Sequence, residues 1–334
     1  MMLEHLPRID LLDGPTPLQR MTRVEAHTSH QSLWVKRDDF MTLGLGGNKL
    51  RSLEYWIAEA ARDSCDILVV AGAPESNQCR LTAATAAKLG MDCLILHGGN
   101  PPANEVGNLM LNRLLGAEIR FLGPVDEAER GQHARQAVAD LTRGGRRPYL
   151  IGNPVVGALG YARAAEELAR QARTMDLALR HVVLSGSMGP TEAGFLFGCA
   201  LLDLGVTVHL ISVEYSAEEL EARVAGIVDG LCRHTGIDLP AGWQQRLAIH
   251  MNQLGDGYGR PTPASIDAVG VAARLESFFL EHTYTAKTFA GLLQLIADGA
   301  IAADEPACFL HTGGTPALFG QIAREPSLLG DGHP

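Results

Sequence analysis

The amino-acid sequence predicts an α/β fold in which parallel sheets are covered by helices. Short apolar or β-branched runs of strand length alternate with longer Ala- and Leu-rich stretches of helical spacing, which is the pattern of strand–helix–strand units. The 334 residues, 46% of them hydrophobic, are enough to bury one or two full cores, and no low-complexity linker or internal repeat divides them. We therefore expect two closely packed lobes, with ligands bound beyond the carboxyl ends of the strands.

The expected elements cover most of the chain in alternating order. Apolar runs predict strands at residues 32–36, 66–71, 92–97, 118–122, 148–151, 181–185, 206–212 and 307–311. Helical spacing of Ala and Leu predicts helices at residues 49–62, 77–89, 104–115, 157–173, 191–204, 217–235 and 263–280. The stretch 144–147 is interpreted as a turn rather than a hinge between domains. A ligand site is expected at the strand-to-helix turns.

Composition and charge exclude several classes of protein. The hydrophobic share excludes intrinsic disorder, and a net charge of 28 − 38 = −10 argues against a nucleic-acid binder that works by bulk charge. The N-terminus lacks the basic and apolar regions of a signal peptide, and no apolar run reaches the ~18 residues needed to span a membrane. We expect a protein with neither nucleic-acid nor membrane partners.

The six cysteines form no C-x-x-C pair, and no group of His and Cys residues has the spacing of a zinc site. A chain of this length does not need disulfide bonds for stability, so reduced and mostly buried thiols are expected. The prediction is a cytoplasmic protein without a bound metal.

Glycine is more frequent than usual, at 37 of 334 residues or about 11% against an ordinary ~7%. Several glycines lie in five turns next to predicted strands and helices. Because glycine lets a backbone approach a ligand closely, the positions of these residues matter more than their number.

The first turn, Gly-Leu-Gly-Gly-Asn-Lys at residues 44–49, precedes a predicted helix. A lysine at the positive end of a helix dipole is electrostatically disfavoured, so Lys49 is a candidate for a functional amine. A glycine turn followed by a solvated lysine explains the segment equally well. The two interpretations stay open on these residues alone.

The second turn, at residues 72–78, follows a predicted strand directly. Ser76 fits the N-cap of the next helix, whose first N–H groups are free. The turn is either a plain helix cap or a cradle for a carboxylate with a hydroxyl beside it.

The third turn, Ser-Gly-Ser-Met-Gly-Pro-Thr at residues 185–191, also joins a strand to a helix. Its glycines and hydroxyl groups are typical of an anion cup of the phosphate type. It is neither a Walker A loop nor a G-x-G-x-x-G fingerprint, which makes a nucleotide-dependent enzyme such as a dehydrogenase a weaker alternative.

The last two turns add tyrosine and hydroxyl groups. Tyr258 and Tyr284 lie near element ends, where half-buried structural tyrosines are also common, and Thr315 fits a helix cap after the strand 307–311. A lysine, an anion cup and polar strand ends together suggest pyridoxal 5′-phosphate (PLP), which needs a Schiff-base lysine, a phosphate site and a group facing its ring nitrogen.

The five turns, in this order, resemble the family of D-cysteine desulfhydrase and 1-aminocyclopropane-1-carboxylate (ACC) deaminase. These are PLP enzymes with the two-domain, tryptophan-synthase-β-like architecture of fold type II. The similarity extends over nearly the whole chain and includes residues 13–18, 36–39, 107–109, 114–117, 157–161 and 311–316.

The resemblance implies roles for individual residues. Lys49 would carry the cofactor and move protons at the substrate Cα, with Ser76, Tyr258 and Tyr284 as further catalytic groups. The substrate would be a small amino acid held by Ser76, Asn77, Gln78, Tyr258 and Tyr284. The implied cofactor-binding residues are Asn48, Lys49, Asn77, Ser185, Gly186, Ser187, Met188, Gly189, Thr191, Thr285, Thr312, Gly313 and Thr315.

The family architecture also implies how the chain is divided. A small domain of residues 51–164 would be inserted into a large PLP-binding domain of residues 1–50 plus 165–334, with the cofactor between them. The protein would be a homodimer.

The sequence departs from the family pattern at three places. Ser52 stands where many relatives have a lysine that reaches the phosphate. The loop 185–191 is one residue longer, with Met188 and with Pro190, which has no N–H to donate. The loop 152–154 is altered, and no role is transferred to it.

Position 285 separates the reactions of the family. ACC deaminases carry a glutamate that faces the pyridine nitrogen, whereas Thr285 resembles the desulfhydrase-like members. We therefore expect α,β-elimination from a small sulfur-containing amino acid, with D-cysteine giving pyruvate, ammonia and sulfide. The alternatives are an L-cysteate sulfo-lyase, an ACC deaminase and a catalytically silent PLP-binding protein.

Overall fold

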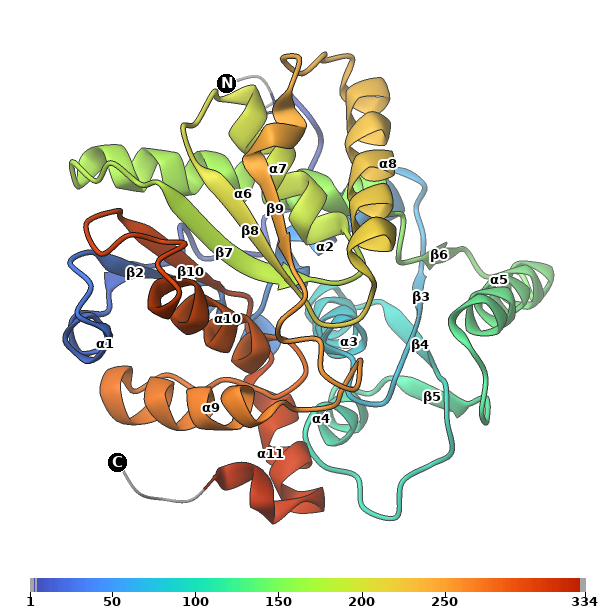
Figure 1. The fold of residues 1–334 in the computed structure, drawn as a ribbon. Coiled ribbons are helices and arrows are strands. Elements are labelled where there is room, and N and C mark those ends of the chain that lie inside the picture. The colour runs from blue at the N-terminus through green and yellow to red at the C-terminus, as the bar shows by residue number, and fades with distance from the viewer. Residues whose placement is uncertain (1–2, 4, 331–334) are drawn as a thin grey trace.

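Two sheets organise the molecule, as Figure 1 shows for the computed structural model, which describes residues 3 and 5–330. The larger sheet has the order β1-β2-β10-β7-β8-β9, and the smaller one has the order β5-β4-β3-β6. The strands are β1 (Leu18–Arg20), β2 (Leu33–Arg37), β3 (Ile67–Gly72), β4 (Asp92–His97), β5 (Glu118–Phe121), β6 (Pro148–Leu150), β7 (His181–Gly186), β8 (Thr207–Ser212), β9 (Leu247–His250) and β10 (Ala307–His311). These sheets confirm the predicted α/β class.

Helices cover both faces of the larger sheet. β1 runs antiparallel to β2, and the other neighbouring strands are parallel. One face carries α1 (Thr22–Thr28), α9 (Pro263–Glu276) and α10 (Thr285–Ala297), and the other carries α6 (Pro154–Thr174), α7 (Pro190–Leu201) and α8 (Ala217–Thr235) (Figure 1). The apolar residues form a separate core on each face.

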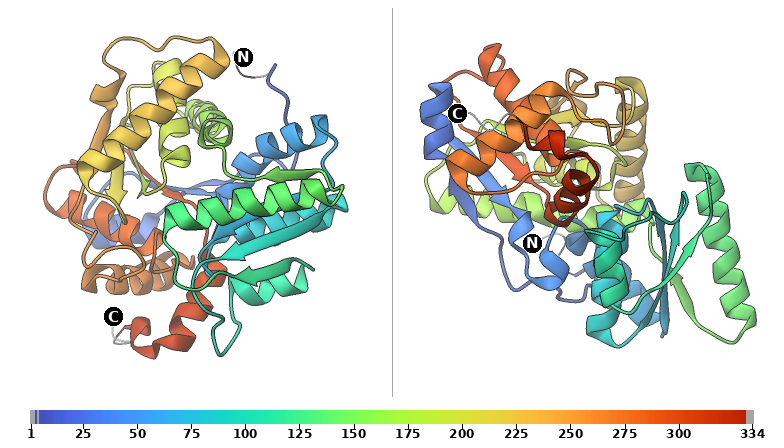
Figure 2. Two further views of the ribbon diagram at one scale, coloured as in Figure 1. Left: turned by 90° about the vertical axis from the view of Figure 1, so that its right-hand side faces the viewer. Right: turned by 90° about the horizontal axis from the view of Figure 1, so that it is seen from below.

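The smaller sheet is entirely parallel and lies beside the larger one (Figure 2). It packs against α3 (Asn77–Leu89) on one face and α5 (Glu127–Arg143) on the other, with α4 (Asn108–Leu114) beside α3. Leu68 and Val70 of β3 join the main core, whereas Ile67 and Val69 pack toward α5. Both faces of this strand are buried, which explains its continuous apolar run.

The helix α2 (Lys49–Arg62) packs against α6, and α11 (Thr315–Arg324) follows β10. The predicted strands are all present, and α2, α3 and α8 have the predicted bounds. The prediction missed the short strands β1 and β9 and the helices α1, α5 and α10, whereas the helix expected after the strand 307–311 is present as α11. In α5 only Ala134 and Ala137 are buried, so the apolar spacing that marks a helix is almost absent from its sequence. None of the helices between residues 5 and 330 combines the length and apolar character needed to cross a bilayer.

A network of buried charges ties α2 to the large sheet. Arg51 donates from Nε and Nη2 to the two carboxylate oxygens of Asp38, each at 2.8 Å, and from Nη1 and Nη2 to the two oxygens of Glu167, each at 3.0 Å. Lys36 also pairs with Glu167, and the Tyr161 hydroxyl donates to Asp38 at 2.5 Å. Burial would raise the pKa of Asp38, but the Arg51 guanidinium outweighs it and lowers that pKa to about 2. The network fixes the orientation of the helix that begins with Lys49.

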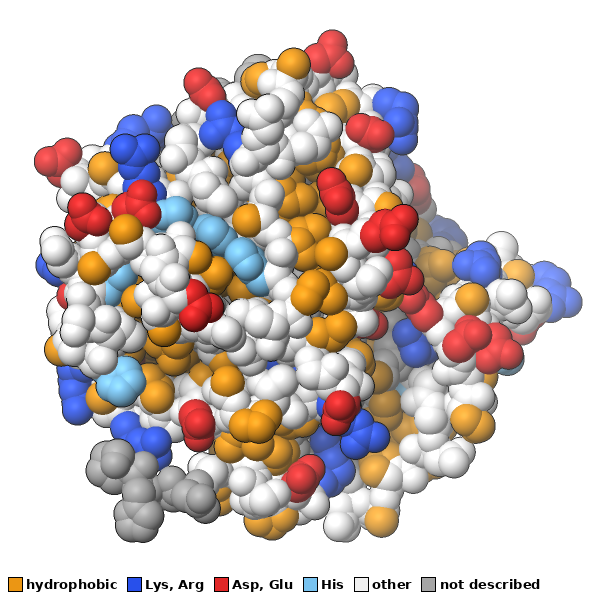
Figure 3. All heavy atoms as spheres, in the orientation of Figure 1, with side chains coloured by type: hydrophobic (Ala, Val, Ile, Leu, Met, Phe, Trp, Pro, Cys, Tyr) orange, Lys and Arg blue, Asp and Glu red, His pale blue; other side chains and the backbone are white. Residues whose placement is uncertain are grey.

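Three histidines form a ladder across β7, β8 and β9, and Figure 3 shows histidine side chains in a row over these strands. His181 Nδ1 lies 3.0 Å from His209 Nε2, and His209 Nδ1 lies 2.9 Å from His250 Nε2. His209 uses one ring nitrogen in each contact, and if one donates while the other accepts, the central ring is neutral. Burial, together with the two neighbouring rings, lowers the pKa of His209 to about 3.

This ladder makes the stability of the fold sensitive to acid. Unfolded His209 takes up a proton near pH ~6.5, whereas the folded residue stays neutral down to about pH 3. The unfolded state therefore binds more protons between these values, and stability falls as the pH drops through this interval, by about 1.4 kcal/mol per pH unit. Urea unfolding of the wild type and His209→Gln at pH 5 and 8 checks this. The wild type should lose more stability than the variant, and His133→Gln, at an exposed position, should behave like the wild type.

Candidate active site

A cavity of about 450 Å³ lies where the carboxyl ends of β3, β7 and β10 meet the start of α2. A second cavity, of about 1290 Å³, adjoins it, and Lys49 lines both. The smaller cavity brings together most of the predicted site residues: Asn48, Lys49, Ser76, Asn77, Gln78, Ser185, Ser187, Met188, Thr191, Tyr258, Tyr284, Thr312 and Gly313. Residues distant in the sequence thus meet at one edge, as the topology of parallel sheets requires.

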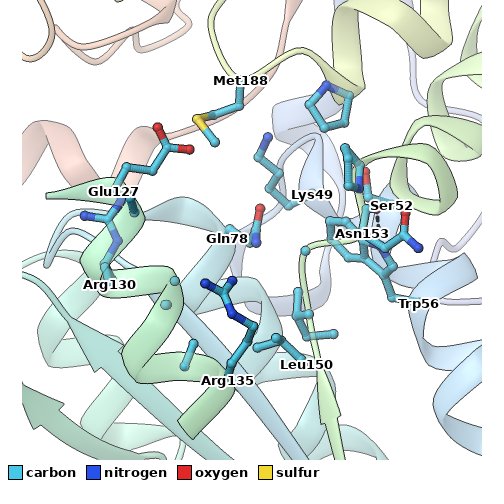
Figure 4. A pocket seen from close by; sticks show the side chains of 18 of the residues that line it. Lys49, Ser52, Trp56, Gln78, Glu127, Arg130, Arg135, Leu150, Asn153 and Met188 are labelled. Atoms are coloured by element: carbon cyan, nitrogen blue, oxygen red, sulfur yellow. Dashed lines mark hydrogen bonds between the residues drawn. The ribbon is translucent and has the colours of Figure 1, made fainter. Parts of the chain in front are cut away.

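Lys49 is the first residue of α2, and its side chain extends into the cavity, as Figure 4 shows. Burial lowers its pKa, while the Glu192 and Glu214 carboxylates act in the opposite direction. An amine with a lowered pKa loses its proton more readily and is then available as a nucleophile or base. The geometry therefore favours the functional interpretation of the first turn over a solvated lysine.

The glycines before Lys49 are required by close backbone contacts. Gly46 has φ +67°, and a Cβ there would lie 2.5 Å from the Asp39 carbonyl oxygen. A Cβ on Gly313 would lie 2.6 Å from the Cα of Gly47. The Asn48 N–H donates to the Thr312 carbonyl at 2.9 Å, so the two glycine turns are joined backbone to backbone. Side chains at these positions would push Lys49 out of place.

Arg80 of α3 donates hydrogen bonds to the backbone of the same turn, although the sequence analysis did not predict this role. Its Nη2 donates to the Gly46 carbonyl at 2.9 Å, and its Nη1 donates to the Gly44 carbonyl. Burial lowers the pKa of this guanidinium to about 10. A buried arginine with backbone acceptors is a positioning residue for the lysine turn.

The turn after β3 has the predicted N-cap. Ser76 Oγ accepts the Cys79 N–H at 3.3 Å, and α3 begins at Asn77. The Asn77 side-chain oxygen accepts from Asn108 of α4 at 2.9 Å, which fixes the amide orientation. Ser76, Asn77 and Gln78 all line the cavity, so the cap also presents polar groups to a ligand.

Two carboxyl groups of the chain itself contact the turn after β7. The Ser187 N–H donates to a Glu192 carboxylate oxygen at 2.5 Å, and the Ser187 hydroxyl donates to Glu214 at 2.5 Å. Burial raises the pKa of both carboxyl groups. Asn48 donates from Nδ2 to the Thr191 hydroxyl at 2.9 Å, which links this turn to the lysine turn. The N–H and hydroxyl donors of Ser187 in the predicted cup are therefore directed at carboxyl oxygens.

The departures in two loops have local explanations. Pro190 is the first residue of α7, where a backbone N–H has no partner within the helix, so proline costs little there. In the altered loop 152–154, the Asn153 side chain caps α6 by accepting the Val155 and Val156 N–H groups at 3.1 and 3.3 Å. Ser52 lines the larger cavity.

Two tyrosines that line the cavity form a pair. The hydroxyl groups of Tyr258 and Tyr284 lie 2.5 Å apart. Burial raises the pKa of both, that of Tyr258 to about 12. Both hydroxyls are therefore protonated at neutral pH. One proton serves the contact between them, and the other remains available to a ligand.

Four predicted cofactor residues do not line the cavity. Gly186 and Gly189 form the backbone of the cup, and a Cβ on either would meet Leu220 or Ile227. The Thr285 hydroxyl lies 3.3 Å from a Glu281 carboxylate oxygen, and its role toward a ring nitrogen stays a prediction. Thr315 lines a different groove. The prediction of Thr315 as a helix cap is wrong, because Gly314, with φ +94°, is the N-cap of α11.

The cavity also contains charged residues that the sequence did not indicate: Asp126, Glu127, Arg130, Glu192 and Glu214. Three of them belong to α5 or its cap, the helix whose polar sequence hid it from prediction. Glu192 follows directly after the segment 185–191, so extending the predicted anion cup by one residue would have included it.

The donor set fits the cofactor that the resemblance implies. Lys49, Asn77, Ser187 and Thr191 all line the cavity, and the Ser187 N–H is directed at a carboxyl oxygen there. The Glu192 carboxyl group occupies that position, so the Ser187 N–H is directed at a carboxyl oxygen. A phosphate bound at the same N–H would require the Glu192 side chain to move.

Comparisons with known proteins agree with this arrangement. Residues 9–313 match the family model described as pyridoxal-phosphate dependent enzyme. A D-cysteine desulfhydrase of Yersinia pestis (strain Pestoides F) is 35% identical over 325 residues, which covers 95% of this chain and 96% of the relative. That of Salmonella paratyphi B is 34% identical over 332 residues, covering 96% and 98%.

Solved structures show the same fold. A crystal structure of an ACC deaminase homologue superposes with a TM-score of 0.89 at 29% identity and covers 98% of both chains. Threonine deaminase isoform 2 from Solanum lycopersicum has a TM-score of 0.68 at 15% identity, covering 94% of this chain and 83% of its own, and supports the fold alone.

Proposed function

Because the chain belongs to the family of pyridoxal-phosphate dependent enzymes, we propose that it catalyses α,β-elimination from D-cysteine, with the residues of this cavity in the roles predicted for them. With water, the reaction gives pyruvate, ammonia and hydrogen sulfide. The observation that supports D-cysteine as the substrate is the 35% identity to D-cysteine desulfhydrases over nearly the full length of both chains. The geometry adds a lysine, an anion cup and a pair of protonated tyrosines around one cavity.

Lys49 moves the proton in this proposal. When bound, PLP stabilises negative charge at the substrate Cα. The buried Lys49 amine, with its lowered pKa, takes the proton from Cα. The turn at Ser76, Asn77 and Gln78 orients the substrate through its carboxylate, since free N–H groups at the start of α3 favour an anion.

The tyrosine pair assists departure of the sulfur. Breaking the Cβ–S bond leaves the electron pair on sulfur, and a nearby hydroxyl that donates a proton lowers this barrier. Tyr258 and Tyr284 stay protonated at neutral pH because burial raises the pKa of both. In this proposal Ser187, Thr191 and Asn48, with the glycines of the cup, bind the phosphate of the cofactor. Thr312 and Gly313 contact its pyridine ring.

A substrate panel tests this function. Purified holoenzyme is assayed for pyruvate and sulfide with D-cysteine, for pyruvate with D-serine and L-cysteate, and for 2-oxobutyrate with ACC. We expect the highest kcat/KM for D-cysteine, with sulfide and pyruvate released in equal amounts. Rapid turnover of ACC with no elimination from the other amino acids would replace the proposal by ACC deamination. A protein with bound PLP and no turnover of any of them would be a silent binding protein.

A homodimer is proposed on the same basis, with an exposed apolar groove as its interface. The groove, of about 710 Å³, is lined in part by Phe40, Leu45, Met110, Phe279 and Phe319. Phe40 and Phe319 are 65% and 66% exposed, and monomers rarely leave so many large apolar side chains together in water. A second copy would cover them. Light scattering should give a mass of about twice 35.7 kDa, and Phe319→Glu should lower it toward one chain.

Two further assignments belong to this proposal. Residues 51–164 would form the smaller domain, since β3–β6 and α3–α5 all lie in this interval, with its borders inside α2 and α6. A cytoplasmic location is supported by the six free cysteines. Protease digestion of the holoenzyme and fractionation of cells check the two assignments.

A further inference from the structure

The N–H donors of the anion cup are engaged by a side chain of the protein itself. Glu192 lies buried in the first turn of α7, and one of its carboxyl oxygens accepts the Ser187 N–H at 2.5 Å. The N–H groups of Ser187 and Gly189 both lower the pKa of this carboxyl group, against the effect of burial. Each backbone N–H is a single donor, so a phosphate bound at these groups competes with Glu192 for them.

Glu192 also has a favourable charge partner in this position. The Lys49 amine lowers the pKa of Glu192, and the Glu192 carboxylate in turn acts to raise the pKa of Lys49. The carboxyl group therefore combines backbone donors with a nearby cation. Displacing it means giving up both contacts, and the ligand that takes its place has to replace them.

The backbone of the cup is held too tightly to move aside in place of Glu192. A Cβ on Gly186 would lie 2.5 Å from Leu220 Cδ2. A Cβ on Gly189 would lie 2.7 Å from Ile227 Cδ1, so α8 packs directly against both glycines. Because this packing fixes the turn, the side chain of Glu192 is the part that has to leave the donors.

The cup has no cation of its own to favour the phosphate over Glu192. The segment 185–191 contains no lysine or arginine. Among the described residues that line the smaller cavity, the cations are Lys49, which the cofactor uses, and Arg130, which comes from α5 across the cleft (Figure 4). Glu214 adds a second carboxyl group, which accepts the Ser187 hydroxyl. A dianionic phosphate therefore meets acidic groups at the donors it needs.

We propose that Glu192 determines how tightly the protein binds PLP, because its carboxyl group competes with the phosphate for the N–H donors of the cup. The inference rests on the proposed function, which places the phosphate at Ser187 and Thr191. Its consequence is specific to one part of the cofactor. Removing the carboxylate tightens binding of a ligand that carries the phosphate and leaves binding of the same ring without phosphate unchanged.

The test compares PLP with pyridoxal, which lacks the phosphate. Dissociation constants for both are measured by absorbance titration of the full chain freed of cofactor, for the wild type, Glu192→Gln and Glu192→Ala. We expect Kd for PLP to fall at least fivefold in Glu192→Gln and further in Glu192→Ala, since a glutamine oxygen can still accept the Ser187 N–H. Kd for pyridoxal should change less than twofold. Glu221→Gln removes the same charge from an exposed position of α8 and should match the wild type.

Two outcomes for the Glu192 variants overturn the inference. An unchanged or higher Kd for PLP in both would mean that the carboxyl group does not compete or that it helps to bind the phosphate. An equal gain for PLP and pyridoxal would place the effect at Lys49 instead of the cup. Circular dichroism of each variant separates these results from a loss of fold.

Thr191→Val tests the placement of the phosphate separately. It should raise Kd for PLP at least fivefold and spare pyridoxal, because it removes a hydroxyl of the cup. No change for either ligand would mean that the phosphate binds elsewhere, and the inference would fall with that placement. Since the titrations contain no amino acid, failure of the proposed elimination would leave their result unchanged.

Discussion

Replacing Lys49 by alanine is expected to reduce pyruvate release by at least ~10³-fold, because the chain then lacks both the covalent anchor for the cofactor and the base for the Cα proton. The visible absorbance of the lysine-bound cofactor, near ~410–420 nm, should disappear from the purified protein. Lys49 has this role because it begins α2 inside the cavity, with a pKa lowered by burial. Absorbance spectra and a pyruvate assay check both results.

Lys88 provides the matched control. It lies in the last turn of α3 with its side chain exposed, so Lys88→Ala should keep both the absorbance and the activity. Retention of the band in Lys49→Ala would show that another lysine carries the cofactor. Circular dichroism of both variants should match the wild type, since neither side chain makes a hydrogen bond within residues 5–330.

Arg51→Leu is expected to destabilise the fold by about 3–5 kcal/mol, since it leaves buried carboxylates without their main partner. Arg51 makes bidentate contacts to both Asp38 and Glu167. The low pKa of Asp38 depends on this guanidinium, so in the variant the carboxyl group must either stay charged without compensation or take up a proton. Urea unfolding at pH 7, followed by circular dichroism, measures the loss.

Arg62 in the same helix is the control for this prediction. It is exposed and pairs with its neighbour Asp63, so Arg62→Leu should change stability by less than about 0.5 kcal/mol. Similar losses in the two variants would mean that helix propensity, rather than the buried network, determines the effect. The wild-type dependence on acid through His209 is separate, because the histidine ladder lies on β7–β9.

Much of the site could be predicted because its residues lie in turns with local signals. The glycines before Lys49, the N-cap at Ser76 and the hydroxyls between Ser185 and Thr191 each follow rules that operate over a few residues. The strands could be predicted for the same reason, since both faces of β3 are buried and its sequence is continuously apolar. Resemblance to a family then connected turns that are far apart in the chain.

The site residues that the sequence analysis did not predict contact groups that lie far from them in the sequence or belong to helices with weak periodicity. Arg80 reaches from α3 to the carbonyl of Gly46, and Glu192 folds back onto the cup. Arg130 belongs to α5, which buries so little apolar surface that its periodicity is weak. Thr285 is the opposite case: it was predicted to face the cofactor, but its hydroxyl faces Glu281 rather than the cavity. No local pattern reports such contacts.

The sequence by itself determined the α/β class, the turns that carry the chemistry and the lysine at their centre, because secondary structure and capping depend on neighbouring residues. Only the tertiary structure decided which charges share the cavity with Lys49. Glu192, Glu214 and Arg130 come from three elements, and their protonation and pairing depend on burial and on groups distant in sequence. Burial and long-range charge are properties of the packed chain, so no local pattern in the sequence reports them.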